Sequence, residues 1–265
     1  MQTPKVILFC LPLLACTVGH KKAEAPTALS QRPNVVLVMT DDQGFGDFGF
    51  AGNPVISTPN LDAMARRSAR MGTFYVSPVC APTRASLMTG RWCQRTRAID
   101  TYIGRAMLEP EERTVAEYLR DAGWGTGIFG KWHLGDCYPM RAMDQGFGES
   151  LVHRGGGIGQ PSDPLGAEAD YTDAVLFRNG EPISTSGYCT DVYFDAAIEF
   201  MRERKAADQP FFAYVATNTP HGPFGDVPEE LYQKYREADL SPDAFPDSVG
   251  HPIPAKNDAD KLARI

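Results

Sequence analysis

The sequence lacks the features that mark several specialised classes of protein. Six cysteines among 265 residues, with no CxxC pair, are too few for a disulfide scaffold and do not suggest a zinc ribbon. Positive charge is not in excess, because 33 acidic and 26 basic residues leave a net charge of −7, which argues against a nucleic-acid partner. The sequence is also not poor in hydrophobic residues, which make up 43% of the chain, and this excludes disorder for most of it. A folded globular protein remains.

An export signal is predicted at the N-terminus. Lys5 supplies positive charge before the apolar run 6–15, which is too short to span about 30 Å of hydrocarbon. Residues 13–16, Leu-Leu-Ala-Cys, are typical of a lipobox, whereas residues 23–25, Ala-Glu-Ala, offer an ordinary secretory cleavage site as the alternative. We expect residues 1–16 to be a signal peptide of the lipoprotein type and residues 17–32 a polar tether. The protein would then be extracytoplasmic, in the periplasm or at the cell surface, with a lipid anchor to the membrane through Cys16.

Strands and helices alternate from residue 33 onwards. The predicted strands are residues 35–39, 126–129 and 211–216, and the predicted helices are a segment opening at Thr58-Pro59, residues 114–120 and residues 190–205 capped by Thr190. Residues 35–39 and 211–216 are unbroken apolar runs, which are typical of strands buried on both faces. The alternation predicts an α/β fold with a doubly wound, mainly parallel sheet flanked by helices, and functional sites at the carboxyl ends of the strands.

Two segments do not follow this alternation. Residues 146–187 are rich in glycine, punctuated by proline and weakly periodic, so we expect a long insertion at the edge of the sheet. A helix predicted from about residue 258 runs to Ile265 without a capping glycine or a following proline. That ending predicts a truncated chain.

Two adjacent carboxylates, Asp41 and Asp42, follow the predicted strand 35–39. They would repel each other unless a cation lies between them, although a solvated turn with a helix N-cap is the simpler alternative. Gly44, Gly46 and Gly49 also match a dinucleotide-binding fingerprint. We reject that site, because the two aspartates would face the pyrophosphate and no helical pattern follows.

Residues 80–91 read Cys-Ala-Pro-Thr-Arg-Ala-Ser-Leu-Met-Thr-Gly-Arg. Pro82 suits a first helical turn, which places Cys80 at a helix N-terminus, where the helix dipole and free N–H groups favour an anion. A single cysteine in such a place is more often a buried core residue than a nucleophile. The whole string, however, resembles the sulfatase signature C-x-P-x-R followed by T-G.

Three further segments resemble sulfatase motifs in the order in which the family carries them. Residues 34–44 resemble the first metal-binding segment, residues 130–135 the G-K-W-H-L-G element, and residues 219–224 the P-H-x-P-F element. The chain is therefore similar to the type I, formylglycine-dependent sulfatases of the alkaline-phosphatase-like superfamily. The resemblance covers about residues 33–224.

This resemblance implies a nucleophile and a metal. A separate formylglycine-generating maturation enzyme would oxidise Cys80 to formylglycine, and a calcium ion (Ca²⁺) would be bound by Asp41, Asp42 and the oxygen of residue 80. The hydrated aldehyde would attack sulfur while the metal and Arg84 hold it. A divalent cation and fixed positive charges suit this reaction, because charge spreads over the sulfate oxygens during transfer.

The resemblance also implies roles for a lysine and two histidines. Lys131 would bind sulfate oxygens, His133 would take a proton at the hydrated aldehyde, and His221 would bind substrate and donate a proton to the leaving alcohol. Taken singly, His133 suits a packed core histidine equally well, and His221 suits a rigid turn. His153 precedes Gly155–Gly159, a stretch without the G-K-[ST] of a phosphate loop, so a flexible insertion and a substrate-binding contact from His153 both stay open. Cys93, Cys137 and Cys189 are expected to be structural or unpaired.

One departure from the family concerns the metal. Sulfatases continue to a strand with an Asp-Asn pair and then a lysine, which residues 225–265 do not contain, and calcium takes six to eight oxygen ligands. We therefore expect residues 33–265 to be the N-terminal part of a sulfatase domain, acting on a sulfate ester such as a sulfated carbohydrate. The alternatives are a secreted, non-catalytic sulfate-binding remnant and, less favoured, a phosphate-ester hydrolase, which would normally use threonine or serine with zinc.

Overall fold

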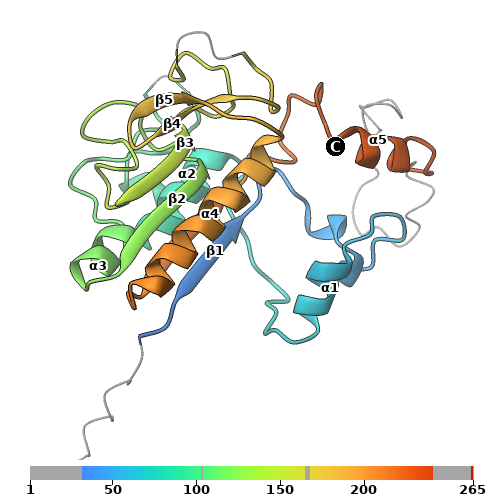
Figure 1. Ribbon diagram of the computed structural model, residues 1–265, viewed down its shortest axis with the longest axis horizontal. Helices are drawn as coiled ribbons and strands as arrows, with labels where there is room; N and C mark the ends of the chain where they lie inside the picture. The colour runs from blue at the N-terminus through green and yellow to red at the C-terminus, as the bar shows by residue number, and fades with distance from the viewer. Residues whose placement is uncertain (1–31, 103, 165–167, 241–263, 265) are drawn as a thin grey trace, which may run out of the picture. The chain divides into compact units, whose positions relative to one another are not determined.

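A six-stranded, mostly parallel sheet is central to the computed structural model, which describes residues 32–102, 104–164, 168–240 and 264 (Figure 1). The strands are β1 Val35–Met39, β2 Gly125–Lys131, β3 Glu149–His153, β4 Val175–Arg178, β5 Glu181–Ser184 and β6 Phe211–Ala216, in the spatial order β1-β6-β2-β3-β4-β5. Strands β1, β6, β2 and β3 run parallel, and β4 and β5 add an antiparallel ribbon. The predicted signal, the predicted tether before Arg32 and the predicted helix from residue 258, apart from Arg264, lie outside the described residues.

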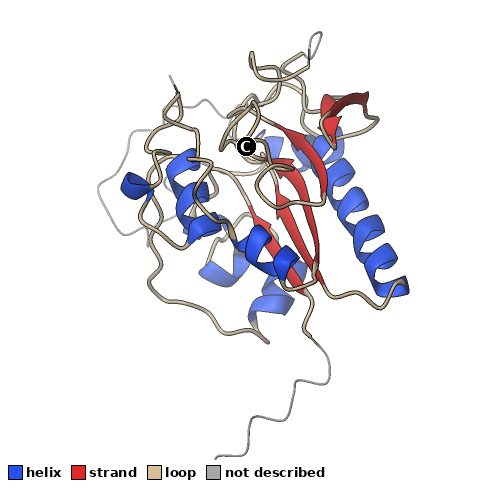
Figure 2. Ribbon diagram, turned by 90° about the vertical axis from the view of Figure 1, so that its left-hand side faces the viewer, coloured by secondary structure: helices blue, strands red, loops and turns tan. Residues whose placement is uncertain are grey.

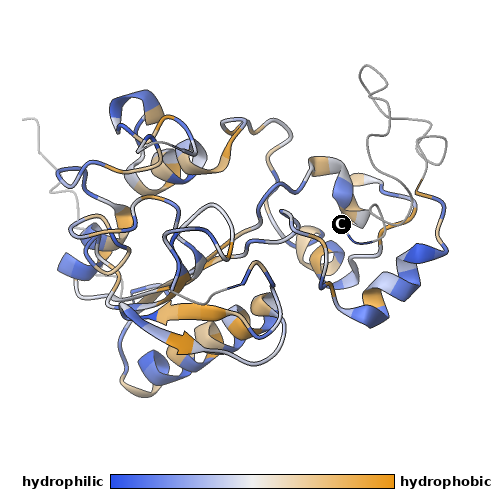
Figure 3. Cartoon of the chain, turned by 90° about the horizontal axis from the view of Figure 1, so that it is seen from above, coloured by the Kyte–Doolittle hydropathy of each residue, from blue (hydrophilic) through white to orange (hydrophobic). Residues whose placement is uncertain are grey.

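Helices cover both faces of this sheet (Figure 2). The helices are α1 Pro59–Ala65, α2 Cys80–Thr89, α3 Val115–Asp121, α4 Cys189–Ala206 and α5 Glu229–Arg236. Buried side chains of α2 and α3 pack with Ile128 and Phe212 in one cluster, whereas those of α4 pack with Phe129 and Val215 in another. Figure 3 shows strongly hydrophobic stretches in the strands of the sheet, although the ends of some strands, such as β3, are polar. The predicted doubly wound α/β fold is thus confirmed. Over the part of the chain that the structure describes, no helix is long and apolar enough to span a membrane.

The helix boundaries follow from local sequence. Thr114 caps α3 in a reciprocal capping box with Glu117, because each side chain accepts from the backbone N–H of the other residue. Gly90 ends α2 in the left-handed conformation, with φ 67°. Helix α4 begins one residue before the predicted cap, so that its N-cap is Tyr188 and Thr190 lies in its first turn, where its Oγ1 lies 3.0 Å from Oγ1 of Thr219.

Gly130 allows two strands to meet closely beside the carboxyl edge of the sheet. Its φ is +119°, and an added Cβ would overlap the carbonyl oxygen of Ala216 on β6. Only glycine tolerates both this backbone conformation and this approach. The next residue along β2 is Lys131, so the glycine lies directly before one of the predicted site residues.

Two predictions about the sheet were wrong. Strand β1 is not buried on both faces, because it lies at the end of the described sheet with β6 as its neighbour, and Val36 and Val38 are about half exposed at 51% and 50%. Residues 146–187 are not simply an edge insertion, since they contain β3, which pairs in parallel with β2 inside the sheet. The short run of β3, Glu-Ser-Leu-Val-His, carries polar residues at both ends and so does not read as a buried strand.

Candidate active site

The carboxyl ends of the parallel strands bring together segments that are distant in sequence. Asp41 and Asp42 follow β1, Lys131 ends β2, His153 ends β3, and His221 lies in the loop after β6. The N–H of Asp41 donates to the carbonyl of Thr219 at 3.1 Å, which joins the loops after β1 and β6. A cavity of about 460 Å³ opens at this edge, within the size range of small-molecule sites. Its lining includes Asp42, Cys80, Thr101, Tyr102, His133 and His221.

Cys80 and His133, which both line the cavity, contact each other. As predicted, Cys80 begins α2 at its N-terminus, and its Sγ lies 3.2 Å from Nδ1 of His133. The other ring nitrogen, Nε2, lies 3.3 Å from the carbonyl oxygen of Thr101. Because a carbonyl only accepts, this contact assigns the proton to Nε2 and leaves Nδ1 as the acceptor facing the thiol.

The imidazole of His133 is neutral at ordinary pH. Burial, together with the positive charges of Lys131 and Arg84, lowers the pKa of His133 from 6.5 to about 3. A neutral ring with a free Nδ1 is able to take a proton from the group at position 80. A bound anion would raise this pKa, since negative charge next to the ring favours its protonated form.

Two cations and one carboxylate are buried beside this pair. Lys131 and Arg84 are 0% exposed and Asp41 is 3% exposed. Lys131 Nζ donates to Asp41 Oδ2 at 2.5 Å, and Arg84 Nη1 donates to the carbonyl oxygen of Lys131 at 2.8 Å. Arg84 Nη2 lies 3.6 Å from Asp41 Oδ1, an ion pair that is too long for a hydrogen bond. The cluster therefore carries one more positive than negative charge.

The guanidinium of Arg84 has hydrogen-bond donors without partners among the described residues. Its Nε and Nη2 are buried, and neither has a hydrogen-bond partner among the described residues. Buried donors without partners are costly in free energy, and a buried excess of positive charge adds to that cost. Both features are relieved by an anion with several oxygen acceptors.

Asp42 and His221 face each other across the mouth of the site. Asp42 is in the left-handed conformation with φ 61°, and its side chain is 63% exposed and lies 3.8 Å from Nε2 of His221. The His221 Nδ1 lies 2.6 Å from the carbonyl oxygen of Gly222, so Nδ1 carries the donated proton. Nε2 of His221 is consequently the ring nitrogen directed towards Asp42.

The predicted calcium ligands do not make up a calcium site within the described ranges. No group of three or more histidine, cysteine, aspartate or glutamate side chains able to hold a metal is present among those residues. Both oxygens of Asp41 face cations, and Asp42 points to His221. Calcium prefers six to eight oxygens, so Asp41 and Asp42 supply part of such a shell at most.

His153 joins the buried part of the site. It is 0% exposed and pairs directly across from Lys131 in the register of β2 and β3. Burial lowers the pKa of His153 well below its usual value, and the charges of Lys131 and Arg84 act in the same direction. In the described structure neither ring nitrogen has a hydrogen-bond partner.

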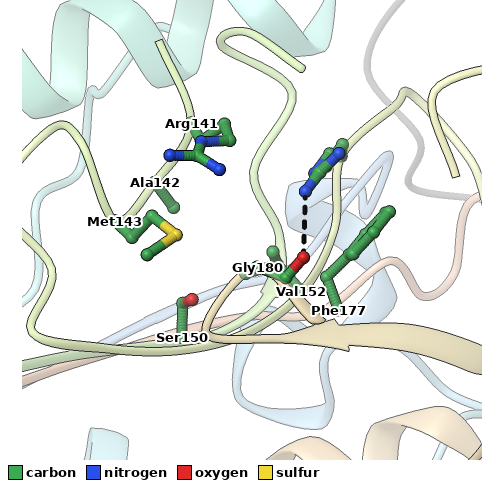
Figure 4. Close-up of a pocket in the computed structure, with 8 residues that line it drawn as sticks. Arg141, Ala142, Met143, Ser150, Val152, Phe177 and Gly180 are labelled. Carbon is green, nitrogen blue, oxygen red and sulfur yellow. Dashed lines mark hydrogen bonds between the residues drawn. The ribbon is translucent and has the colours of Figure 1, made fainter. Parts of the chain in front are cut away.

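A second hollow lies on β3 and the loop before it (Figure 4). Its volume is about 10 Å³, which is room for about one water molecule. Arg141 and Met143 lie on one side, and Phe177 and Gly180 on the other. Arg154 closes it by stacking on Phe177, with the guanidinium carbon 3.4 Å from the ring centroid. None of the predicted site residues lines this hollow, so it plays no part in the candidate site.

The cysteines outside the site are unpaired where they are described. Cys93 and Cys189 are buried, Cys137 is exposed, and all three are free, which agrees with the prediction of structural or unpaired residues. The thiol of Cys189 donates to Oδ1 of Asn218 at 3.2 Å. Burial raises the pKa of Cys189 to about 12, so this thiol is inert.

Several site residues carry no signal in the sequence. Thr101 and Tyr102 line the cavity from a loop with no motif, and Gln160 lines it from the glycine-rich stretch, where its Oε1 accepts from the N–H of Gly156 at 2.7 Å. Gly156 itself faces His133, because an added Cβ would lie 2.9 Å from Cε1 of that ring. The glycine-rich stretch is visible in the sequence, but the contact of Gly156 with His133 arises only from the fold.

Curated relatives of this chain are sulfatases. An arylsulfatase of Klebsiella aerogenes is 34% identical over 226 residues, which are 80% of this chain and 48% of that relative. The chain thus spans about half the length of the curated relatives it matches.

Solved structures share the fold. Ps i-CgsB, solved alone and in complex with k-i-k-neocarrahexaose, is 30% identical with a TM-score of 0.67 over 77% of this chain and 48% of that chain. A structure solved in complex with its substrate, D-glucosamine-2-N,6-O-disulfate, is 26% identical with a TM-score of 0.64 over 77% of this chain and 37% of that chain. The family model described as Sulfatase matches residues 33–246. The protein therefore belongs to the sulfatase family, within the alkaline-phosphatase-like superfamily.

Proposed function

We propose that this chain belongs to a sulfuric ester hydrolase whose nucleophile arises at position 80. The observation that carries the proposal is the placement of Cys80. Its thiol lies at a helix N-terminus, 3.2 Å from the neutral ring of His133, beside a buried cluster with an excess of positive charge. This arrangement suits a reaction in which an anionic group is attacked by a residue that gives up a proton.

The cations would bind and polarise the sulfate group. A sulfate ester carries one negative charge that spreads over its oxygens as the bond to the leaving oxygen breaks. Lys131 and the unpartnered Nε and Nη2 of Arg84 are donors buried away from water, where such interactions are strongest. They would hold the sulfate group next to residue 80 and stabilise the charge that develops.

The nucleophile would be formylglycine made from Cys80 by a maturation enzyme. When present, formylglycine would supply a hydrated aldehyde, one hydroxyl of which would bond to sulfur as the bond from sulfur to the leaving alcohol breaks. Loss of the proton of the second hydroxyl would then re-form the aldehyde and release sulfate. The thiol of Cys80 occupies the place of the attacking oxygen, and its contact with Nδ1 of His133 places a proton acceptor beside that group.

His221 would serve the leaving group. Its Nε2 is directed towards the exposed carboxylate of Asp42, and both residues line the cavity. A proton held at Nε2 would be passed to the oxygen of the leaving alcohol.

Calcium belongs to the proposal only as a ligand of Asp41 and Asp42. Within the described residues these carboxylates provide at most part of a shell, so further oxygens would have to complete it. When bound, the ion would add positive charge beside the sulfate group. Asp41 would have to give up its contact with Lys131, which would free the ammonium group for the substrate.

The substrate class we propose is a sulfated carbohydrate. Support comes from a 26%-identical structure whose substrate is a disulfated glucosamine, and the cavity of about 460 Å³ is large enough for one sugar unit with its sulfate group. An extracytoplasmic protein with a lipid anchor at Cys16 would meet such polymers outside the cell. A non-catalytic sulfate-binding protein is the alternative, because the described metal ligands are incomplete.

The test is sulfate release by the full-length protein that contains these residues, produced together with a formylglycine-generating enzyme and supplied with calcium. We expect the protein to release sulfate from a nitrophenyl sulfate and from a sulfated glucosamine, and Cys80→Ala to release none while folding normally. Preferential hydrolysis of nitrophenyl phosphate would contradict the proposal. Binding of sulfate without turnover would favour the non-catalytic alternative.

A further inference from the structure

His153 lies in the buried layer of the site rather than on the surface of the cavity. It is the last residue of β3, it is 0% exposed, and its register partner on the parallel strand β2 is Lys131. The N–H of Trp132, which follows Lys131, donates to the carbonyl oxygen of His153 at 3.2 Å and fixes the two strand ends against each other. The sheet thus fixes the backbone that carries the imidazole.

The ring of His153 is fully buried but chemically unsatisfied. Among the described residues neither Nδ1 nor Nε2 has a hydrogen-bond partner. Buried polar groups without partners are rare in folded proteins, and each one destabilises the fold. A side chain of this kind is expected where a ligand supplies the missing partner.

The charges around His153 indicate what kind of ligand this is. The strongest charge interactions of the ring are with Lys131 and Arg84, which are both fully buried cations. Next to them the ring is neutral, so it offers one N–H donor and one acceptor. Arg84 has its own unpartnered donors, and an anion rich in oxygen atoms would satisfy both residues together.

We propose that His153 donates a hydrogen bond to an oxygen of the bound sulfate group, next to Lys131 and Arg84. The inference rests on the proposed function, and it adds to the site a neutral donor that lies outside the matched sulfatase motifs. Because the ring carries no charge, its contribution is to direction and affinity rather than to overall attraction. Arg84 and Lys131 supply the charge, and His153 fixes one oxygen.

The experiment measures binding of inorganic sulfate by calorimetry to the full chain with Cys80 unconverted, using chloride at equal ionic strength as the reference. His153→Leu removes both nitrogens, and His153→Asn keeps an N–H donor. Leu151→Met is the matched control, because Leu151 is buried on the same strand two residues earlier and the change conserves volume. The same proteins are unfolded in denaturant without sulfate.

We expect His153→Leu to bind sulfate at least about tenfold more weakly, since a hydrogen bond to a charged group is lost. Without sulfate, His153→Leu should be as stable as the wild type or more stable, because two unpartnered nitrogens are removed. His153→Asn should recover part of the affinity, and Leu151→Met should bind like the wild type.

Two results would overturn the inference while leaving the sulfate site intact. One is equal affinity of the wild type and His153→Leu. The other is a loss of stability in His153→Leu with no recovery of affinity in His153→Asn, because packing alone would then explain the histidine. Absence of sulfate binding by the wild type itself would overturn the proposed function along with the inference, and so is distinguishable from both.

Discussion

Replacing Asp41 by asparagine tests the buried charge cluster most sharply. The substitution keeps the shape of the side chain but removes the charge that faces Lys131 at 2.5 Å and Arg84 at 3.6 Å. Both cations are 0% exposed, so water cannot replace the lost carboxylate. Removing one partner of a buried ion pair typically destabilises a protein by about 3–5 kcal/mol. We expect Asp41→Asn to lower the free energy of unfolding by about that amount.

Sulfate should reverse much of this loss. With Asp41 neutral, the cluster carries two uncompensated cations, so it should bind sulfate more tightly than the wild type does. A ligand present at a hundredfold excess over its dissociation constant stabilises a folded protein by about 2.7 kcal/mol. The stability difference between wild type and Asp41→Asn should therefore shrink as sulfate is added, whereas chloride at the same ionic strength should change it little.

The assay is equilibrium denaturation at neutral pH with and without sulfate. Asp42→Asn is the control, because that side chain is 63% exposed and should cost less than about 0.5 kcal/mol. Two results would refute the reasoning. One is a decrease in the free energy of unfolding of less than about 1 kcal/mol for Asp41→Asn, and the other is equal stabilisation of the wild type and Asp41→Asn by sulfate.

Three further predictions concern the groups around this cluster. Gly130→Ala should destabilise the protein by several kcal/mol or prevent folding, because the added Cβ would overlap the carbonyl of Ala216. The control is Gly46→Ala, where a Cβ would meet open space, and its free energy of unfolding should stay within about 1 kcal/mol of the wild-type value. Equilibrium denaturation of both variants tests this. Because the pKa of His133 falls from 6.5 to about 3 on folding, the unfolded chain binds more protons in that window, so stability should fall with decreasing pH by up to about 1.4 kcal/mol per unit. His133→Gln should show a smaller fall, and an equal slope would contradict this cause. Gly156→Ala should displace the His133 ring and slow sulfate release by the converted protein, whereas an unchanged rate would show that the contact is unimportant.

The elements that the sequence predicted well are those that local chemistry determines. Strand β6 is an apolar run whose predicted ends agree with the structure, and α3 is bounded by a capping box that is legible in the sequence. The N-terminus of α2 at Cys80 followed from Pro82 and from the family motif. In these places few alternative conformations compete with the native one.

The features that the sequence did not predict depend on tertiary context. An apolar run such as β1 does not reveal whether both of its faces will be covered, and here Val36 and Val38 are half exposed. Strand β3 was missed because its burial depends on pairing with β2, whereas its own residues alternate poorly.

The candidate site was predicted as a set of residues but not as a set of contacts. The motifs predicted Cys80 and His133 as site residues, and the structure places Sγ of Cys80 3.2 Å from Nδ1 of His133. The ion pair between Lys131 and Asp41 was not predicted, because the motif implied that Asp41 is a metal ligand. Thr101 and Tyr102 were missed entirely, since a loop residue enters a site through the path of the chain and not through its type.

The central claim is that the buried cations beside Cys80 hold a sulfate group. The most direct measurement is a crystal structure of the full chain with a sulfate monoester bound. We predict the sulfate group within hydrogen-bond distance of Lys131 and Arg84, with its sulfur facing the side chain of residue 80. A sulfate group found only at the protein surface, with Lys131 still bound to Asp41 alone, would contradict the account.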